Sequence, residues 1–143
     1  MPPSRIRVLA LGLVFHQTRL LVAEGYDTVK QSTFYRALGG EVEFGESSRE
    51  ALEREFWEEI CAGLANIEYL GCLENLFEYE GKAGHEIIQL YKCDLQDPTF
   101  YQQEVIVGDE GGDRFLARWI EGDRFHTREL NLVPAACLTY LRA

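Results

Sequence analysis

Acidic residues are concentrated in one short segment of this chain. Eight glutamates lie between positions 41 and 59: the first three follow the glycine pair Gly39-Gly40, and the last three belong to the run Arg54-Glu55-Phe56-Trp57-Glu58-Glu59. Carboxylate oxygens are the ligands that Mg²⁺ prefers, and a bound Mg²⁺ neutralises the charge of a phosphate group. The segment therefore indicates a magnesium site that serves a phosphorylated ligand.

The position of the later glutamates around a helix supports this interpretation. At about 100° per residue, Glu55 and Glu59 lie about 40° apart, in an apolar sector between Ala51 and Leu52, and Glu58 lies about 60° to the other side of Glu55. A glutamate that only solubilises a helix would lie on the outer face. Neighbouring carboxylates raise one another's pKa and are costly to keep ionised without a cation. These residues favour a metal site, with a plain acidic helix as the alternative.

The segment resembles a known family motif. Gly40, Glu46 and the run from Arg54 to Glu59 are similar to the Nudix box, Gly-x5-Glu-x7-Arg-Glu-hydrophobic-x-Glu-Glu-x-Gly-hydrophobic. The match covers residues 40–62 and includes every charged position and the first glycine. On these residues the chain is identified as a member of the Nudix hydrolase family.

The motif departs from the family pattern at its end. Cys61 stands in place of the late glycine, and Ala62 stands in place of the large hydrophobic residue that follows it. The glycine normally closes the helix in a left-handed conformation. No charged position is lost, so we expect altered geometry at the helix end, or a shift of that end toward Gly63, rather than loss of metal binding.

The resemblance implies a fold and an activity. The expected fold is α+β, a Nudix-type α/β/α sandwich with a mixed β-sheet in which the box forms a loop-helix-loop, over a single domain of residues 1–143. The expected enzyme is a Nudix hydrolase acting on phosphoanhydride bonds: a Mg²⁺-dependent pyrophosphohydrolase that cleaves a nucleoside diphosphate linked to another group. The alternative is a non-catalytic Nudix-fold sensor that binds a nucleotide and regulates a partner.

The resemblance also implies roles for individual residues. Glu55, Glu58 and Glu59 are the expected ligands of Mg²⁺, or of Mn²⁺ in its place. Glu58 and Glu59 are also catalytic candidates, together with Arg54 and Glu46, and Glu46 is expected to position Arg54. The residue that takes the proton from the attacking water stays open, since a glutamate outside the box is a further candidate.

Substrate contacts are expected at the glycine bend and nearby. Arg36, Gly39 and Gly40 are the expected substrate-binding residues, with Arg36 contacting a phosphate. The family often takes an additional acidic residue from the loop before the last strand, and the sequence does not choose among Glu104, Asp109 and Glu110. Aromatic residues at strand spacing either stack on a base or belong to the sheet and core; these are Phe77, Tyr79 and Tyr91.

Composition limits the partners. A net charge of −10 argues against binding a nucleic acid polymer or an anionic membrane, whereas a small phosphorylated substrate that comes with a cation remains compatible. The apolar runs near the N-terminus are much shorter than the roughly 20 residues that span a bilayer. Four widely spaced cysteines predict reduced, mostly buried thiols and a cytoplasmic protein. The sequence leaves a homodimer open.

The elements that position these residues follow from local patterns. Strands are predicted at 6–15, 20–24, 34–37 and 115–120, and an antiparallel hairpin at 67–80 and 85–94. Ser47 and Glu50 are spaced as a capping box, which predicts a helix over residues 48–60. Loops are expected at 25–32 and 95–113. A closing helix over 132–141 is expected to begin after Asn131 as its cap.

Overall fold

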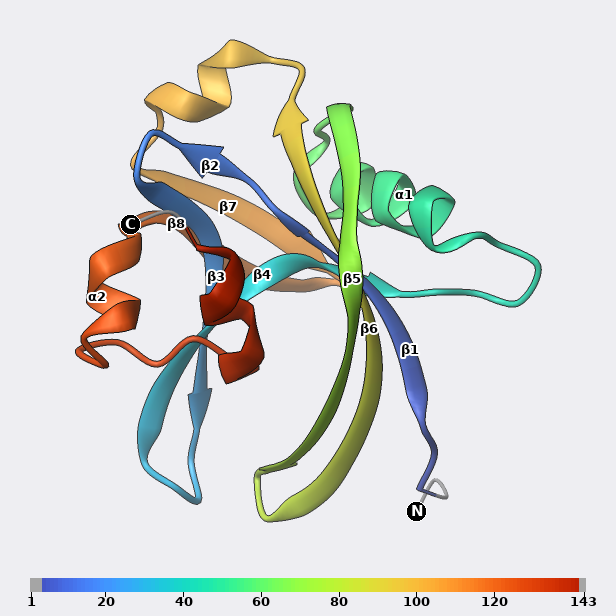
Figure 1. The fold of residues 1–143 in the computed structure, drawn as a ribbon, viewed down its shortest axis with the longest axis vertical. Helices are drawn as coiled ribbons and strands as arrows, with labels where there is room; N and C mark the ends of the chain where they lie inside the picture. Colours follow the sequence, from blue (N-terminus) through green and yellow to red (C-terminus); the bar gives the residue numbers. More distant parts are fainter. Residues whose placement is uncertain (1–3, 142–143) are drawn as a thin grey trace.

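A mixed β-sheet forms the centre of the molecule (Figure 1). The computed structural model describes residues 4–141, so residues 1–3 and 142–143 of the predicted domain lie outside the described residues. The strands are β1 (Arg7–Leu13), β2 (Phe15–His16), β3 (Arg19–Asp27), β4 (Ser32–Glu41), β5 (Leu64–Tyr79), β6 (Lys82–Leu95), β7 (Val105–Glu110) and β8 (Asp113–Glu121). They pair in the order β5-β6-β1-β4-β3-β8-β7, and β2 pairs with β3.

Strand β1 lies inside the sheet, between β6 and β4, and is buried on both faces. It pairs antiparallel with β4 and parallel with β6, which makes the sheet mixed. Side chains alternate across a strand, so Leu9, Leu11 and Leu13 enter one hydrophobic cluster and Ala10 enters the other. A strand that is apolar on both sides requires a covering layer on each face of the sheet.

Helices supply these two layers. Helix α1 (Ser48–Ile60) packs on one face through Leu52 and Phe56. On the other face lie α2 (Gly122–His126), which buries Phe125, and a 3₁₀ helix at Ala135–Tyr140; Figure 1 shows α1 and α2 on opposite sides of the sheet. The predicted α+β fold with a mixed sheet is confirmed. Within residues 4–141, no helix is long and apolar enough to cross a membrane.

Helix α1 begins as the sequence predicts. The Ser47 side chain accepts a hydrogen bond from the Glu50 backbone N–H at 3.1 Å, and the Glu50 carboxylate accepts one from the Ser47 N–H at 3.2 Å. This reciprocal capping box satisfies two of the N–H groups that the first turn leaves without helical partners. The helix therefore starts at a fixed residue, which also fixes the directions of its glutamates.

The end of α1 corrects one expectation. The helix ends at Ile60, and Cys61 is its C-cap in the left-handed conformation, with φ 56° and ψ 36°. The Cys61 N–H donates to the Trp57 carbonyl at 2.9 Å. The expected shift toward Gly63 is wrong, because the cysteine itself adopts the conformation that a glycine would take more easily.

Two predicted loops are shorter than expected. The 25–32 loop is a turn of residues 28–31, because backbone pairing between β3 and β4 continues past the last apolar side chains. The 95–113 loop contains a 3₁₀ helix, Pro98–Gln102, and strand β7. In β7 only Ile106 and Gly108 are buried, so this edge strand carries too weak an apolar pattern to be recognised.

The predicted closing helix over 132–141 is also wrong. Residues 131 and 133 are extended instead: the Tyr35 N–H donates to the Asn131 carbonyl at 2.8 Å, and the Val133 N–H donates to the Tyr35 carbonyl at 2.9 Å. Pro134 disfavours a helical conformation in the residue before it. A 3₁₀ helix starts only after Pro134, which takes the cap position expected for Asn131.

Candidate functional site

A pocket of about 810 Å³ lies where α1 meets β4 and the end of β7. All three predicted metal ligands, Glu55, Glu58 and Glu59, line it together with Gly40 and Arg54. The rest of its wall consists of Arg5 and Arg7, residues 41–44 and residues 109–111. The helix, the glycine bend and a distant strand thus contribute to one cavity.

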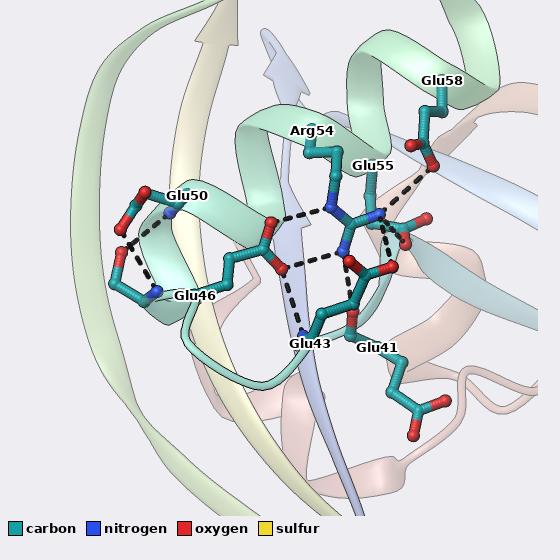
Figure 2. Close-up of polar contacts among 8 residues, drawn as sticks. Glu41, Glu43, Glu46, Glu50, Arg54, Glu55 and Glu58 are labelled. Atoms are coloured by element: carbon teal, nitrogen blue, oxygen red, sulfur yellow. Dashed lines mark hydrogen bonds and ion pairs between the residues drawn. The ribbon is translucent and has the colours of Figure 1, made fainter.

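Arg54 is the centre of the polar contacts in this pocket (Figure 2). Its Nε and Nη2 donate to the two carboxylate oxygens of Glu46 at 2.7 and 2.9 Å. Its Nη1 donates to Glu55 at 2.8 Å and to Glu58 at 3.2 Å, and Nη2 also donates to the Glu41 carbonyl at 2.9 Å. The hydrogen bonds from Arg54 hold the pKa of Glu46 below its ordinary value. Glu46 thus fixes Arg54, and Arg54 draws together two carboxylates of α1.

Glu59 is the most buried of the three predicted ligands. Its relative exposure is 7%, and its Oε1 has no hydrogen-bond partner among residues 4–141. Burial, followed by the charges of Glu110 and Glu55, raises the pKa of Glu59 to about 9. The Gly39 N–H donates to this carboxylate and opposes the rise. A carboxylate in this position lacks a positive partner.

The glycine bend gives the carboxylates room. A Cβ at Gly39, where φ is 143°, would lie 2.0 Å from the Ala10 carbonyl oxygen. A Cβ at Gly40 would lie 2.4 Å from the Glu55 carboxyl group. Bare backbone is therefore required beside the site, and any side chain at position 40 would displace Glu55.

The structure distinguishes the three acidic candidates outside the box. Glu110, the last residue of β7, lines the pocket. Burial is the main cause of the raised pKa of both Glu55 and Glu59, and the charge of Glu110 adds to it. Asp109 also lines the pocket, but it accepts a hydrogen bond from the Gly112 N–H at 2.8 Å. Glu104 is exposed and lines neither this pocket nor the second one described below. Glu110 is the acid that faces the glutamates of α1.

The carboxylates of Glu55, Glu58 and Glu59 suit a divalent cation, although the three side chains are not already arranged around one point. Within residues 4–141, no three His, Cys, Asp or Glu side chains are grouped closely enough to hold a metal ion. Arg54 engages Glu55 and Glu58, whereas Glu59 lies buried with one oxygen unpaired. Hard carboxylate oxygens and an unpaired buried oxygen fit Mg²⁺ or Mn²⁺.

A second pocket, of about 520 Å³, adjoins the first and has a different character. Arg7 and Glu110 line both pockets, and four aromatic residues line the second: Phe34, Phe77, Tyr79 and Phe115. Of the aromatic residues considered from the sequence, Phe77 and Tyr79 face this pocket. Tyr91 instead is buried, with its hydroxyl 2.5 Å from Ser48 Oγ.

Arg36 belongs to the second pocket and does not line the first. Its Nη2 donates to Glu86 Oε1 at 2.6 Å. The sequence reasoning missed Glu86, which is 1% exposed. Glu86 shares the two-residue period of Ile88 and Leu90 on β6, so the inward side of a predicted strand could have revealed it.

Comparison with known proteins places the chain in a family. The model of the NUDIX domain matches residues 3–131, so the chain belongs to the NUDIX family. The predicted class, a Nudix hydrolase acting on phosphoanhydride bonds, agrees with that membership. A comparison with curated proteins finds no match.

Solved structures share the fold. A NUDIX hydrolase from Nitrosomonas europaea has a TM-score of 0.63 at 16% identity, covering 91% of this chain and 82% of that one. A MutT NUDIX hydrolase from Burkholderia pseudomallei has a TM-score of 0.59 at 18% identity, covering 84% and 86%. The ORF135 protein of E. coli has a TM-score of 0.57 at 22% identity, covering 93% and 84%. The predicted Nudix-type sandwich is confirmed.

Proposed function

We propose that this chain is a Mg²⁺-dependent pyrophosphohydrolase that cleaves a nucleoside diphosphate linked to another group. It is proposed to act in the cytoplasm as one domain over residues 1–143. The observation that supports this best is the buried Glu59 carboxylate, which has an unpaired oxygen beside Glu55 and Glu110 in an acidic pocket. Such an arrangement is costly without a bound cation.

Glu55, Glu58 and Glu59 would hold the metal ion, with Glu110 as a further acidic neighbour. The bound ion would polarise a phosphoryl oxygen and neutralise the charge that develops there. Mn²⁺ has similar ligand preferences and is the expected substitute for Mg²⁺.

The other residues of the pocket are proposed to position these groups. Glu46 holds Arg54, and Arg54 keeps Glu55 and Glu58 on the pocket side of α1. Gly39 and Gly40 are proposed to let a phosphate approach the backbone beside the carboxylates, because neither carries a side chain. Glu58 and Glu59 are the proposed bases that accept the proton of the attacking water, and Glu59 Oε1 has no competing hydrogen bond among the described residues.

The second pocket is proposed to take the nucleoside. Its aromatic walls, including Phe77 and Tyr79, suit a planar base. Arg36 lies in this pocket, and we place its guanidinium near the phosphate that carries the nucleoside.

An activity panel tests the proposal. Purified protein is incubated with Mg²⁺ and a set of nucleoside diphosphate derivatives, and the phosphate products are followed by ³¹P NMR. Glu58→Gln is expected to lower turnover by on the order of 10²-fold or more. Glu53→Gln is the matched control, because Glu53 is exposed on the same helix and lines neither pocket; it should retain activity within about twofold. Equal turnover in Glu58→Gln and the unmodified chain would remove the proposed site.

One observation favours a second candidate, a nucleotide-binding sensor without turnover. Two of the three predicted ligands are engaged by Arg54, and no three acidic side chains of residues 4–141 are grouped closely enough to hold a metal ion. A sensor predicts tight binding of a nucleotide from the panel, with no products after prolonged incubation in Mg²⁺ or Mn²⁺. The same panel therefore separates the two candidates.

A further inference from the structure

One cationic side chain connects the two pockets. Among the described residues, Arg5, Arg7 and Arg54 are the cations that line the first pocket, and Lys30, Arg36 and again Arg7 line the second. Arg7 is thus the cationic residue that both pockets share. A substrate with its phosphates in the first pocket and its base in the second would lie beside Arg7.

The arginines of this region differ in how firmly they are held. Arg54 is bound by several acceptors, and Arg5 donates twice to Glu41, at 2.6 and 3.2 Å. The Arg7 guanidinium is held less closely than either of these. Its Nε lies 3.5 Å from Glu41 Oε2, its Nη1 lies 3.6 Å from Glu86 Oε2, and it is 43% exposed. Arg7 is therefore held by long contacts to two carboxylates, and its donors are open to a closer acceptor on a ligand.

Glu86 is the buried anchor of this arrangement. Its Oε1 accepts hydrogen bonds from Arg36 at 2.6 Å and from Asn75 at 3.2 Å. Its Oε2 is buried without a hydrogen bond among residues 4–141, and the nearby charge is the Arg7 guanidinium. A buried carboxylate is stable only beside positive charge. Glu86 thus holds Arg7 at the junction without using its N–H groups.

We propose that Arg7 is a substrate-binding residue that donates to the phosphate group at the junction of the two pockets, and that Glu86 positions it there. A guanidinium presents paired N–H donors that match two oxygens of a phosphate group. The inference rests on the proposed function, since it concerns the same phosphorylated substrate. Phosphate binding by Arg7 would be a role of strand β1, which lies outside the Nudix box.

The test uses two pairs of probes, and the members of each pair differ only in phosphate. Dissociation constants are measured by calorimetry in Mg²⁺ for the hydrolysis-resistant α,β-methylene diphosphates of adenosine and guanosine, and for the two free nucleosides. For each base, the ratio of the nucleoside constant to the diphosphate constant is the phosphate preference. Arg7→Gln is expected to reduce this preference about tenfold or more, because a hydrogen bond to a charged group is lost, and to leave nucleoside affinity unchanged. Arg7→Lys should retain part of the preference, since it keeps the charge but loses the paired donors.

Controls separate the outcomes. Arg49→Gln makes the same change in net charge at an exposed residue that lines neither pocket, and it should leave the preference within about twofold. Glu86→Gln should lower the preference by a smaller factor than Arg7→Gln, with nucleoside affinity as the check that the pocket is intact. Full phosphate preference in Arg7→Gln would overturn the inference and leave the proposed function standing. Absence of any phosphate preference in the unmodified chain would instead overturn the proposed function, and the inference with it.

Discussion

Replacement of Cys61 by glycine should stabilise the protein. Cys61 closes α1 with φ 56° and ψ 36°, a left-handed conformation that costs a residue with a Cβ about 1–2 kcal/mol. Glycine adopts this conformation freely, but its unfolded chain is more flexible, which costs about 0.5–1 kcal/mol. Because the Cys61 side chain is exposed, its removal sacrifices little buried surface. The expected net gain for Cys61→Gly is about 0.5–1 kcal/mol.

Thermal and urea unfolding measure this gain. For a chain of 143 residues, the gain corresponds to a rise in Tm of about 2–3 °C. Cys61→Ala is the control, because it removes the thiol but keeps the Cβ, so its stability should stay close to that of the unmodified chain. If Cys61→Gly is no more stable than Cys61→Ala, the left-handed helix end carries no measurable strain and the reasoning is refuted.

Three further predictions concern pH, thiol reactivity and the glycine bend. Backbone hydrogen bonds, the largest contribution coming from the Lys30 N–H, hold the pKa of Asp27 below its ordinary value. Asp27→Asn should therefore destabilise the protein at neutral pH. Urea unfolding should show that this loss of stability shrinks as the pH falls from about 4 through the folded-state pKa. Burial raises the pKa of Cys93 to about 12 and that of Cys137 to about 11, so at pH 8 Ellman's reagent should react quickly with the two exposed cysteines and with these two only after unfolding. Gly40→Ala should displace the Glu55 carboxyl group and lower kcat/KM by on the order of 10²-fold, with little change in Tm.

The elements that the sequence predicted correctly have strong local signals. The capping box at Ser47 and Glu50 fixes the start of α1, and the glycine-containing turn near Gly81 separates the two strands of the β5–β6 hairpin. Strand β7 and the segment after Leu132 were missed for different reasons. Strand β7 pairs with β8 through the two-residue turn Gly111-Gly112, a local hairpin signal that was overlooked because the strand has few buried apolar residues. The segment around Leu132 instead pairs with Tyr35, a partner distant in sequence, so no local pattern could predict its conformation.

The candidate site was predictable in part on the same physical basis. Helical spacing placed Glu55 and Glu59 toward the interior and Glu58 further out, and their side chains follow that order. Spacing cannot show which distant residues meet the helix. Glu110 and Arg7 reach the pocket through the pairing of strands in the sheet, so only the structure shows that these two residues lie beside α1.

The charge of the first pocket links these observations. Seven carboxyl groups and three arginines line it, so its own cations do not neutralise it. Burial, and after it that imbalance of charge, raises the pKa of Glu59 to about 9. A phosphorylated substrate alone would be repelled there, whereas a divalent cation would neutralise two of the negative charges and attract the phosphate. A net charge of −10 is therefore compatible with a phosphate substrate, provided that the metal ion and the substrate bind together.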